Sequence, residues 1–64
     1  MEVNVEKLWE LRVNYRLTQR QLARRAGIAN TTLAKIEHAG GAMPPTLKKI
    51  ADVLGVKPID LLDR

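Results

Sequence analysis

Hydrophobic residues recur three and four positions apart along most of the chain, which is the spacing of a buried face on an α-helix. This spacing, with the helix-boundary residues, predicts five helices, over about residues 3–15, 19–26, 30–38, 44–54 and 59–62. The buried stripes of the first and fourth helices are Val5, Leu8 and Leu11, and then Leu47, Ile50, Ala51 and Leu54. The apolar–polar alternation of strands is missing. The pattern therefore predicts an all-α fold in a single domain of residues 1–64.

Residues that start and stop helices lie at the expected boundaries. Thr18 is a good N-cap for the second helix, and Gln21, three positions later, is placed for a capping box. Gly27 supplies the positive φ that ends this helix. Pro44 opens the fourth helix, where the first N–H groups lack a partner in any case. The second and third helices are thus joined by a tight turn, which predicts a helix-turn-helix over about residues 18–38.

The third helix is expected to have one buried and one solvent-facing side. Ala23 lets the second helix approach it closely, because a larger side chain would push the two apart. Its own inner face is formed by Ile28, Leu33 and Ile36. Its outer face carries small, polar or basic side chains, namely Asn30, Thr31, Thr32, Ala34 and Lys35. A helix with such an outer face suits the major groove of DNA.

Charge is unevenly placed along the chain. Eleven basic and seven acidic side chains give a net charge of +4. Six of the cations lie between Leu11 and Ile36, a segment without a single acid: Arg12, Arg16, Arg20, Arg24, Arg25 and Lys35. The rest of the chain has five basic and seven acidic residues and is net negative. A solvated arginine-rich face is the alternative interpretation, but this degree of segregation favours a polyanionic partner.

The composition argues against several other classes of protein. There is no cysteine for a disulfide or a thiolate zinc site, and the lone His38 cannot build a metal site. No nucleophile–base pair, glycine-rich phosphate loop or carboxylate pair is recognisable, so we expect no enzyme, no cofactor and no small-molecule ligand. No apolar run approaches the ~18 residues of a membrane span, and no leader is visible, so we expect a cytoplasmic protein.

Taken together, these features resemble the helix-turn-helix family of Cro and phage repressors, also called the XRE family. The matching pieces are, in order, Leu11-Arg12, Leu17-Thr18-Gln19, Leu22-Ala23, Gly27-Ile28, Leu33, Ile36-Glu37, Leu47-Lys48-Lys49-Ile50-Ala51-Asp52-Val53-Leu54-Gly55-Val56 and Asp60-Leu61-Leu62. The resemblance implies a compact five-helix, lambda-repressor-like domain. It also implies sequence-specific binding of double-stranded DNA for transcriptional control, usually repression, by a homodimer on a palindromic operator.

The outer face of the third helix and the resemblance together identify candidate DNA contacts. Asn30, Thr31 and Lys35 are expected at base edges, where asparagine can pair with adenine and lysine with guanine. The alternative for Asn30 is helix capping, because Ala29 stands where the family often has a capping serine or threonine. The expected contacts to the DNA backbone are Thr18, Gln19, Arg20, Arg24, Thr32 and Arg12, whereas Arg16 and Arg25 are expected to be solvated.

The resemblance also implies a structural ion pair between Arg12 and Glu37 that ties the first helix to the third. Arg16 departs from the family, which often has glycine with positive φ at this position. Arginine in that conformation costs roughly 1 kcal/mol, unless the helix ends earlier, at Asn14. The loop of residues 40–43 is expected near a second phosphate strand, although it lacks the basic residues usual in the family.

Three apolar residues allow two interpretations. Trp9 follows the buried Leu8 stripe and is expected either at the edge of the core, near the last helix, or in a dimer contact. Leu61 and Leu62 at the end of the chain are candidates for the same dimer contact, because two leucines there exceed what one small core needs.

Two other functions compete with that of a DNA-binding repressor. The chain could be the antitoxin of a toxin–antitoxin pair, with the same DNA-binding surface and an adjacent toxin gene. It could instead be a protein-interaction adaptor that keeps the fold without binding DNA, in which case duplex DNA would not be retained at ~150 mM salt.

Overall fold

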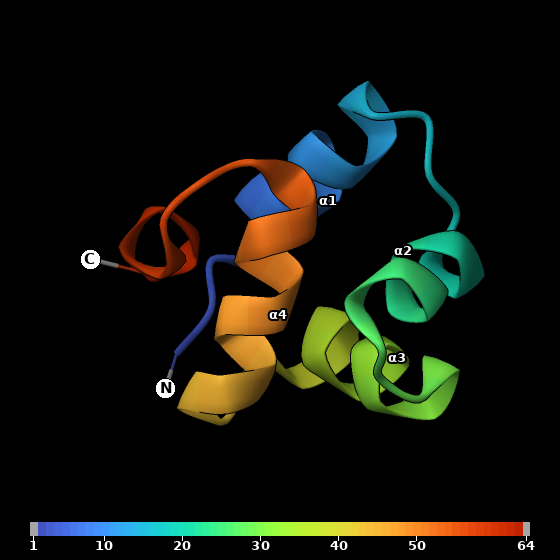
Figure 1. The fold of residues 1–64 in the computed structure, drawn as a ribbon. Helices are drawn as coiled ribbons and strands as arrows, with labels where there is room; N and C mark the ends of the chain where they lie inside the picture. The colour runs from blue at the N-terminus through green and yellow to red at the C-terminus, as the bar shows by residue number, and fades with distance from the viewer. Residues whose placement is uncertain (1, 64) are drawn as a thin grey trace.

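The computed structural model describes residues 2–63 and contains four α-helices followed by one short 3₁₀ turn within that range. They are α1 (Val5–Asn14), α2 (Gln19–Ala26), α3 (Asn30–Ala39), α4 (Pro44–Leu54) and the 3₁₀ helix η1 (Pro58–Leu61). Figure 1 shows α4 crossing the middle of the molecule, with α1 behind it and α2 and α3 together on one side. No helix in the described part of the chain is long and apolar enough to cross a membrane.

Every helix contributes a fully buried side chain to one core. These residues are Leu8 of α1, Leu22 of α2, Leu33 of α3, Leu47, Ile50 and Leu54 of α4, and Leu61 of η1. The stripe expected in α4 is therefore confirmed, because all four of its residues are buried. The stripes expected in the first and third helices are confirmed in part: Leu8, Leu33 and Ile36 are buried, whereas Val5, Leu11 and Ile28 are half-buried. Aliphatic side chains fill this core without an aromatic ring, which suits close packing of short helices.

The all-α prediction is confirmed, but two of the predicted helices differ from the structure. The expected fifth helix is only the 3₁₀ turn η1, in which the side chain of Asp60 accepts a hydrogen bond from the N–H of Lys57 at 3.0 Å. The first helix begins at Val5 rather than near residue 3, because Asn4 caps it by accepting from the N–H of Lys7 at 3.1 Å. Val3 lies before this cap as a buried residue in an extended segment.

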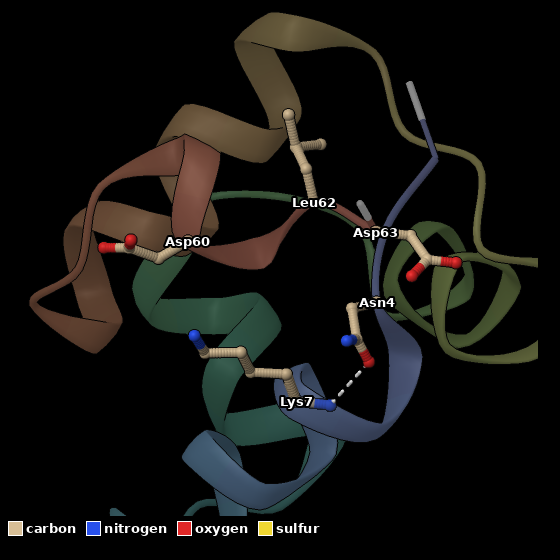
Figure 2. Close-up of a pocket in the computed structure, with 5 residues that line it drawn as sticks. All are labelled: Asn4, Lys7, Asp60, Leu62 and Asp63. Atoms are coloured by element: carbon tan, nitrogen blue, oxygen red, sulfur yellow. Dashed lines mark hydrogen bonds between the residues drawn. The ribbon is translucent and has the colours of Figure 1, made fainter.

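The two ends of the described chain lie side by side. Val3 forms an antiparallel bridge with Leu62, and Glu2 forms one with Gly41. A cavity of about 380 Å³ lies next to this contact, lined by Asn4, Lys7, Asp60, Leu62 and Asp63 (Figure 2). None of these lining residues belongs to α2 or α3, so the cavity is separate from the helix-turn-helix.

Each of the four α-helices is followed by a residue with a left-handed backbone. Three of these residues are glycines, namely Gly27 (φ 71°), Gly40 (φ 83°) and Gly55 (φ 67°). After α1 the left-handed residue is Arg16, with φ 56°. Although α1 ends at Asn14, the turn that follows still places Arg16 in the conformation that disfavours a side chain.

The start of α3 has no side-chain cap. Ala29 is the N-cap residue and Asn30 is already the first helical residue, so the alternative in which Asn30 caps the helix is wrong. The physical reason is that the cap acceptor must project from the extended residue before the first turn, which here is alanine. The amide of Asn30 is therefore not used to cap its own helix.

Ala29→Ser is expected to raise the free energy of unfolding by about 1 kcal/mol, because its hydroxyl would accept a hydrogen bond from an N–H of the first turn. For a domain of this size the melting temperature should rise by about 4–8 °C, measurable by circular dichroism. Ala39→Ser is the control, because it places the same hydroxyl on an exposed site at the other end of α3. Equal melting temperatures for the two variants would show that the start of α3 gains nothing from a side-chain cap.

Candidate nucleic-acid interface

The helix-turn-helix is built on a close crossing of α2 and α3. Ala23 of α2 is only 1% exposed, so a larger side chain at this position would have to displace its neighbours in the core. Ile28 donates its N–H to the carbonyl of Ala23 at 3.0 Å, which closes the turn after α2. A Cβ added at Gly27 would meet no atom within 4 Å, so this position needs glycine for its positive φ and not for space.

α3 presents its first turn to solvent. Leu33 and Ile36 on its inner face are buried, whereas all three expected base-contact residues, Asn30, Thr31 and Lys35, are exposed. Beside them lies a shallow groove of about 180 Å³, to which Thr32 and Lys35 contribute from α3 and Thr46 from α4. The structure thus brings the expected base contacts together on one accessible helix.

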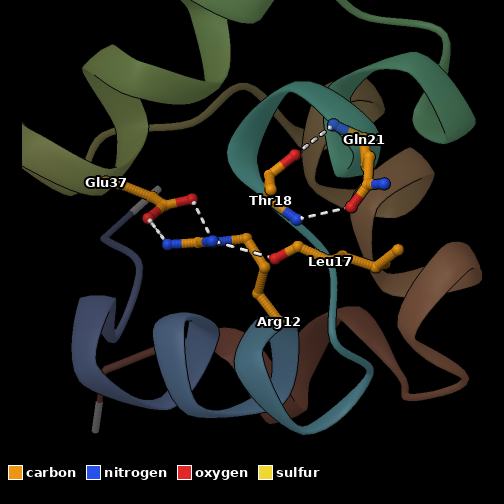
Figure 3. Close-up of polar contacts among 5 residues, drawn as sticks. All are labelled: Arg12, Leu17, Thr18, Gln21 and Glu37. Carbon is orange, nitrogen blue, oxygen red and sulfur yellow. Dashed lines mark hydrogen bonds and ion pairs between the residues drawn. The ribbon is translucent and has the colours of Figure 1, made fainter.

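The amino end of α2 has unused hydrogen-bond donors. Thr18 accepts from the N–H of Gln21 at 3.1 Å, and the side chain of Gln21 accepts from the N–H of Thr18 at 2.9 Å (Figure 3). The expected capping box is therefore present. It leaves the backbone N–H groups of Gln19 and Arg20 without an acceptor among residues 2–63, and such groups at a helix N-terminus attract anions.

Arg12 and Glu37 form the ion pair that the sequence indicated, at the junction of α1 with α3. Arg12 Nη2 donates to Glu37 Oε1 at 3.1 Å, and Arg12 Nε lies 3.0 Å from Glu37 Oε2 (Figure 3). The second contact is close, but it does not have hydrogen-bond alignment, so it is electrostatic. The two side chains are only 12% and 8% exposed.

Arg12 has a second role that sequence reasoning missed. Its Nη1 donates to the carbonyl of Leu17 at 3.0 Å, so one guanidinium holds both α3 and the turn before α2 (Figure 3). No spacing rule indicates such a contact, because it depends on the rotamer of one side chain across an irregular turn. Arg12 is thus a structural residue first, and its expected contact to the DNA backbone stays a prediction.

The remaining cations of the basic segment have no acidic partner among residues 2–63. Arg16, Arg20, Arg24, Arg25 and Lys35 are all exposed. The two ion pairs found within residues 2–63 involve Arg12 and Lys48 instead. Because Glu37 is occupied by Arg12, these five charges have nothing in the described protein to neutralise them. They make this part of the molecule strongly attractive to an anion.

The start of α4 is a poor anion site, although the sequence suggested a phosphate strand nearby. Pro44 and Pro45 have no N–H, and the N–H of Leu47 already donates to the carbonyl of Met43 at 2.9 Å. Met43 provides no side-chain cap. Thr46 thus supplies the single backbone donor left in this first turn, where most helices offer several.

The candidate dimer residues are placed differently from one another. Leu61 is 0% exposed, so it belongs to the core and the expectation of a dimer contact there is wrong. Leu62 is half-buried against the core. Trp9 is 52% exposed, more than expected of a residue at the edge of the core. The core does use one of the two leucines near the end of the chain, because η1 packs against α4 through Leu61.

The fold and this surface define a helix-turn-helix protein. The sequence model described as helix-turn-helix matches residues 10–61, which is most of the chain. The chain belongs to this family, of the XRE type.

Two solved structures are similar to it. The N-terminal DNA binding domain of SinR from Bacillus subtilis superposes with a TM-score of 0.86 at 27% identity, covering 94% of this chain and 90% of that one. A complex of the SinR and SinI proteins matches with a TM-score of 0.82 at 29% identity, over 94% of this chain and 60% of the matched chain. No curated protein sequence matches.

Proposed function

We propose that this protein is a transcription regulator that binds specific double-stranded DNA sequences by inserting the first turns of α3 into the major groove. The observation that carries the proposal is the exposed, polar start of α3, together with five exposed cations of the basic segment that have no acidic partner among residues 2–63. The similarity to the DNA binding domain of SinR supports it, because the match covers nearly the whole of both chains.

The contacts divide into two groups with different chemistry. Asn30, Thr31 and Lys35 read base edges, because they are exposed at the start and on the outer face of α3. The free N–H groups of Gln19 and Arg20 bind phosphate and set the orientation of the domain on the duplex. Thr18 is the N-cap of α2, and Arg24 and Thr32 lie on α2 and α3, so these three residues add further backbone contacts.

The protein acts as a homodimer on a palindromic operator and represses transcription by occupying it. The longest axis of the domain is 26 Å. Two copies can therefore sit side by side on half-sites separated by one helical turn, about 34 Å. The half-exposed Trp9 remains a candidate for the contact between them. Analytical ultracentrifugation with and without the operator tests the stoichiometry, and one copy per operator would contradict the dimer.

Selection of bound sequences from a random duplex pool tests the proposal directly. We expect an enriched site with two inverted half-sites, and binding that weakens steeply as salt rises. An adaptor without DNA-binding activity would retain no duplex at ~150 mM salt. An antitoxin would show the same enriched site and would also bind the product of an adjacent gene.

Lys35→Ala is expected to weaken binding to the selected site by about 10- to 100-fold, because one base contact contributes about 1–3 kcal/mol of discrimination. Binding to random duplex should weaken much less. Lys49→Ala is the control, because Lys49 is an exposed cation of α4 outside the basic segment. Fluorescence anisotropy on both duplexes measures the difference. Equal losses on the two duplexes would place Lys35 at the DNA backbone.

A further inference from the structure

We infer that Arg16 is an additional phosphate-binding residue and that this contact is the role of a side chain at a position where glycine would avoid backbone strain. The inference rests on the proposed DNA-binding function and deepens it. Arg16 is exposed, has no ion pair with any residue of the range 2–63, and has a left-handed backbone that disfavours side chains.

The turn after α1, which contains Arg16, has the same backbone hydrogen bonds as the turns after α2 and α4. Leu17 donates its N–H to the carbonyl of Arg12 at 3.1 Å, and Arg16 donates to the carbonyl of Val13 at 2.8 Å. The same pair of hydrogen bonds closes α2 and α4, a common way for helices to end. The residues in the left-handed position are Arg16 after α1, Gly27 after α2 and Gly55 after α4. Only the first of these turns uses a residue with a side chain.

The side chain of Arg16 gains little within the protein itself. It makes no hydrogen bond or ion pair with the rest of the described chain. A cation does interact favourably with the C-terminal end of a helix, but Arg12 already occupies the last turn of α1 with an ordinary helical backbone. Glycine at residue 16 would keep the turn and remove the strain. Residues held in strained backbone conformations cluster at functional sites.

The location of Arg16 fits a phosphate contact. It lies two residues before Thr18, the N-cap of α2, so their Cα atoms are at most about 7 Å apart. The turn between them is held in place, because Arg12 Nη1 donates to the carbonyl of Leu17 at 3.0 Å. The free N–H groups of Gln19 and Arg20 follow directly. A guanidinium next to such a helix start can bind a phosphate through two parallel hydrogen bonds.

Arg16→Gly tests the inference, because it should move stability and binding in opposite directions. We expect the melting temperature to rise by about 4 °C as the strain is removed. Affinity should fall about fivefold, equally for the selected site and for random duplex, because phosphate is common to both. The slope of log affinity against log salt should become shallower by about 0.9, the value for one lost phosphate contact.

Two further variants make the result specific. Arg16→Lys keeps the charge and the strain but loses the two parallel hydrogen bonds, so its affinity should fall less than that of Arg16→Gly, and its salt slope should equal that of the parent protein. Lys49→Ala removes one charge elsewhere and should leave the salt slope unchanged. If Arg16→Gly binds both duplexes like the parent protein with the same slope, or loses affinity only for the selected site, or melts no higher, the inference is overturned. If the parent protein binds neither duplex, the proposed function itself fails, and the inference with it.

Discussion

Glu37→Ala is expected to lower the free energy of unfolding by about 3–4 kcal/mol, because it leaves the guanidinium of Arg12 buried without its counter-charge. Arg12 and Glu37 are only 12% and 8% exposed, so water cannot easily replace the lost carboxylate. The pair also joins α1 to α3 across 25 positions of sequence, and no other described ion pair does this. Urea unfolding followed by circular dichroism measures the change.

Asp52→Ala is the matched control, since it removes one acid from the Lys48–Asp52 pair, whose side chains are 70% and 63% exposed. This loss should be below about 0.5 kcal/mol, because solvent screens an exposed pair within one helix. The double variant Arg12→Leu/Glu37→Leu should be more stable than Glu37→Ala, because it buries no unpaired charge. Equal losses for Glu37→Ala and Asp52→Ala would show that burial does not strengthen the Arg12–Glu37 pair.

Ala23→Leu is expected to lower the free energy of unfolding by about 3 kcal/mol and to weaken DNA binding in the variant that remains folded. Ala23 of α2 is 1% exposed, and α2 packs against both α3 and α4, so three additional carbon atoms must displace the neighbouring helices. The start of α3 would then shift relative to the amino end of α2, and the proposed base and phosphate contacts could not form together. Urea unfolding and fluorescence anisotropy measure the two effects.

Ala39→Leu is the control for added size, because Ala39 is exposed at the end of α3. We expect its stability to change by less than about 0.5 kcal/mol. If Ala23→Leu folded and bound like the parent protein, close approach at this alanine would not determine the geometry of the helix-turn-helix.

The parts of the fold that sequence predicted are those fixed by neighbouring residues. α4 begins at Pro44 and ends before Gly55, as expected. Proline in the first turn and glycine directly after the last turn fix these two ends. The capping box of Thr18 and Gln21 is also local, since the two residues are three positions apart. Such signals act through one or two turns of backbone, so a single sequence shows them directly.

The parts that sequence missed depend on distant contacts. Val3 is buried because it pairs with Leu62, and a two-residue bridge leaves no periodic pattern. The buried position of Leu61 follows from the docking of η1 on α4 rather than from its own neighbours. The hydrogen bond from Arg12 to the carbonyl of Leu17 is a third example, because only the rotamer of Arg12 decides it. Such contacts between distant residues are visible only in the folded structure.

The Arg12–Glu37 pair links stability to the candidate site. One guanidinium holds the end of α3 through Glu37 and the entry to α2 through Leu17. Because α2 and α3 also pack against each other and are joined by a hydrogen-bonded turn, the amino ends of both helices have one relative position. In the proposed complex, a phosphate at α2 and a base pair at α3 would then be bound simultaneously, without the ordering cost that a flexible pair of helices would have.

Protection of guanine N7 from methylation by dimethyl sulfate tests the position of α3 most directly, because N7 lies in the major groove. On the selected duplex, the account predicts protected guanines within each half-site, with protection of one guanine per half-site lost in Lys35→Ala. Guanines that remain fully reactive in a saturated complex would contradict the placement of α3 in the major groove.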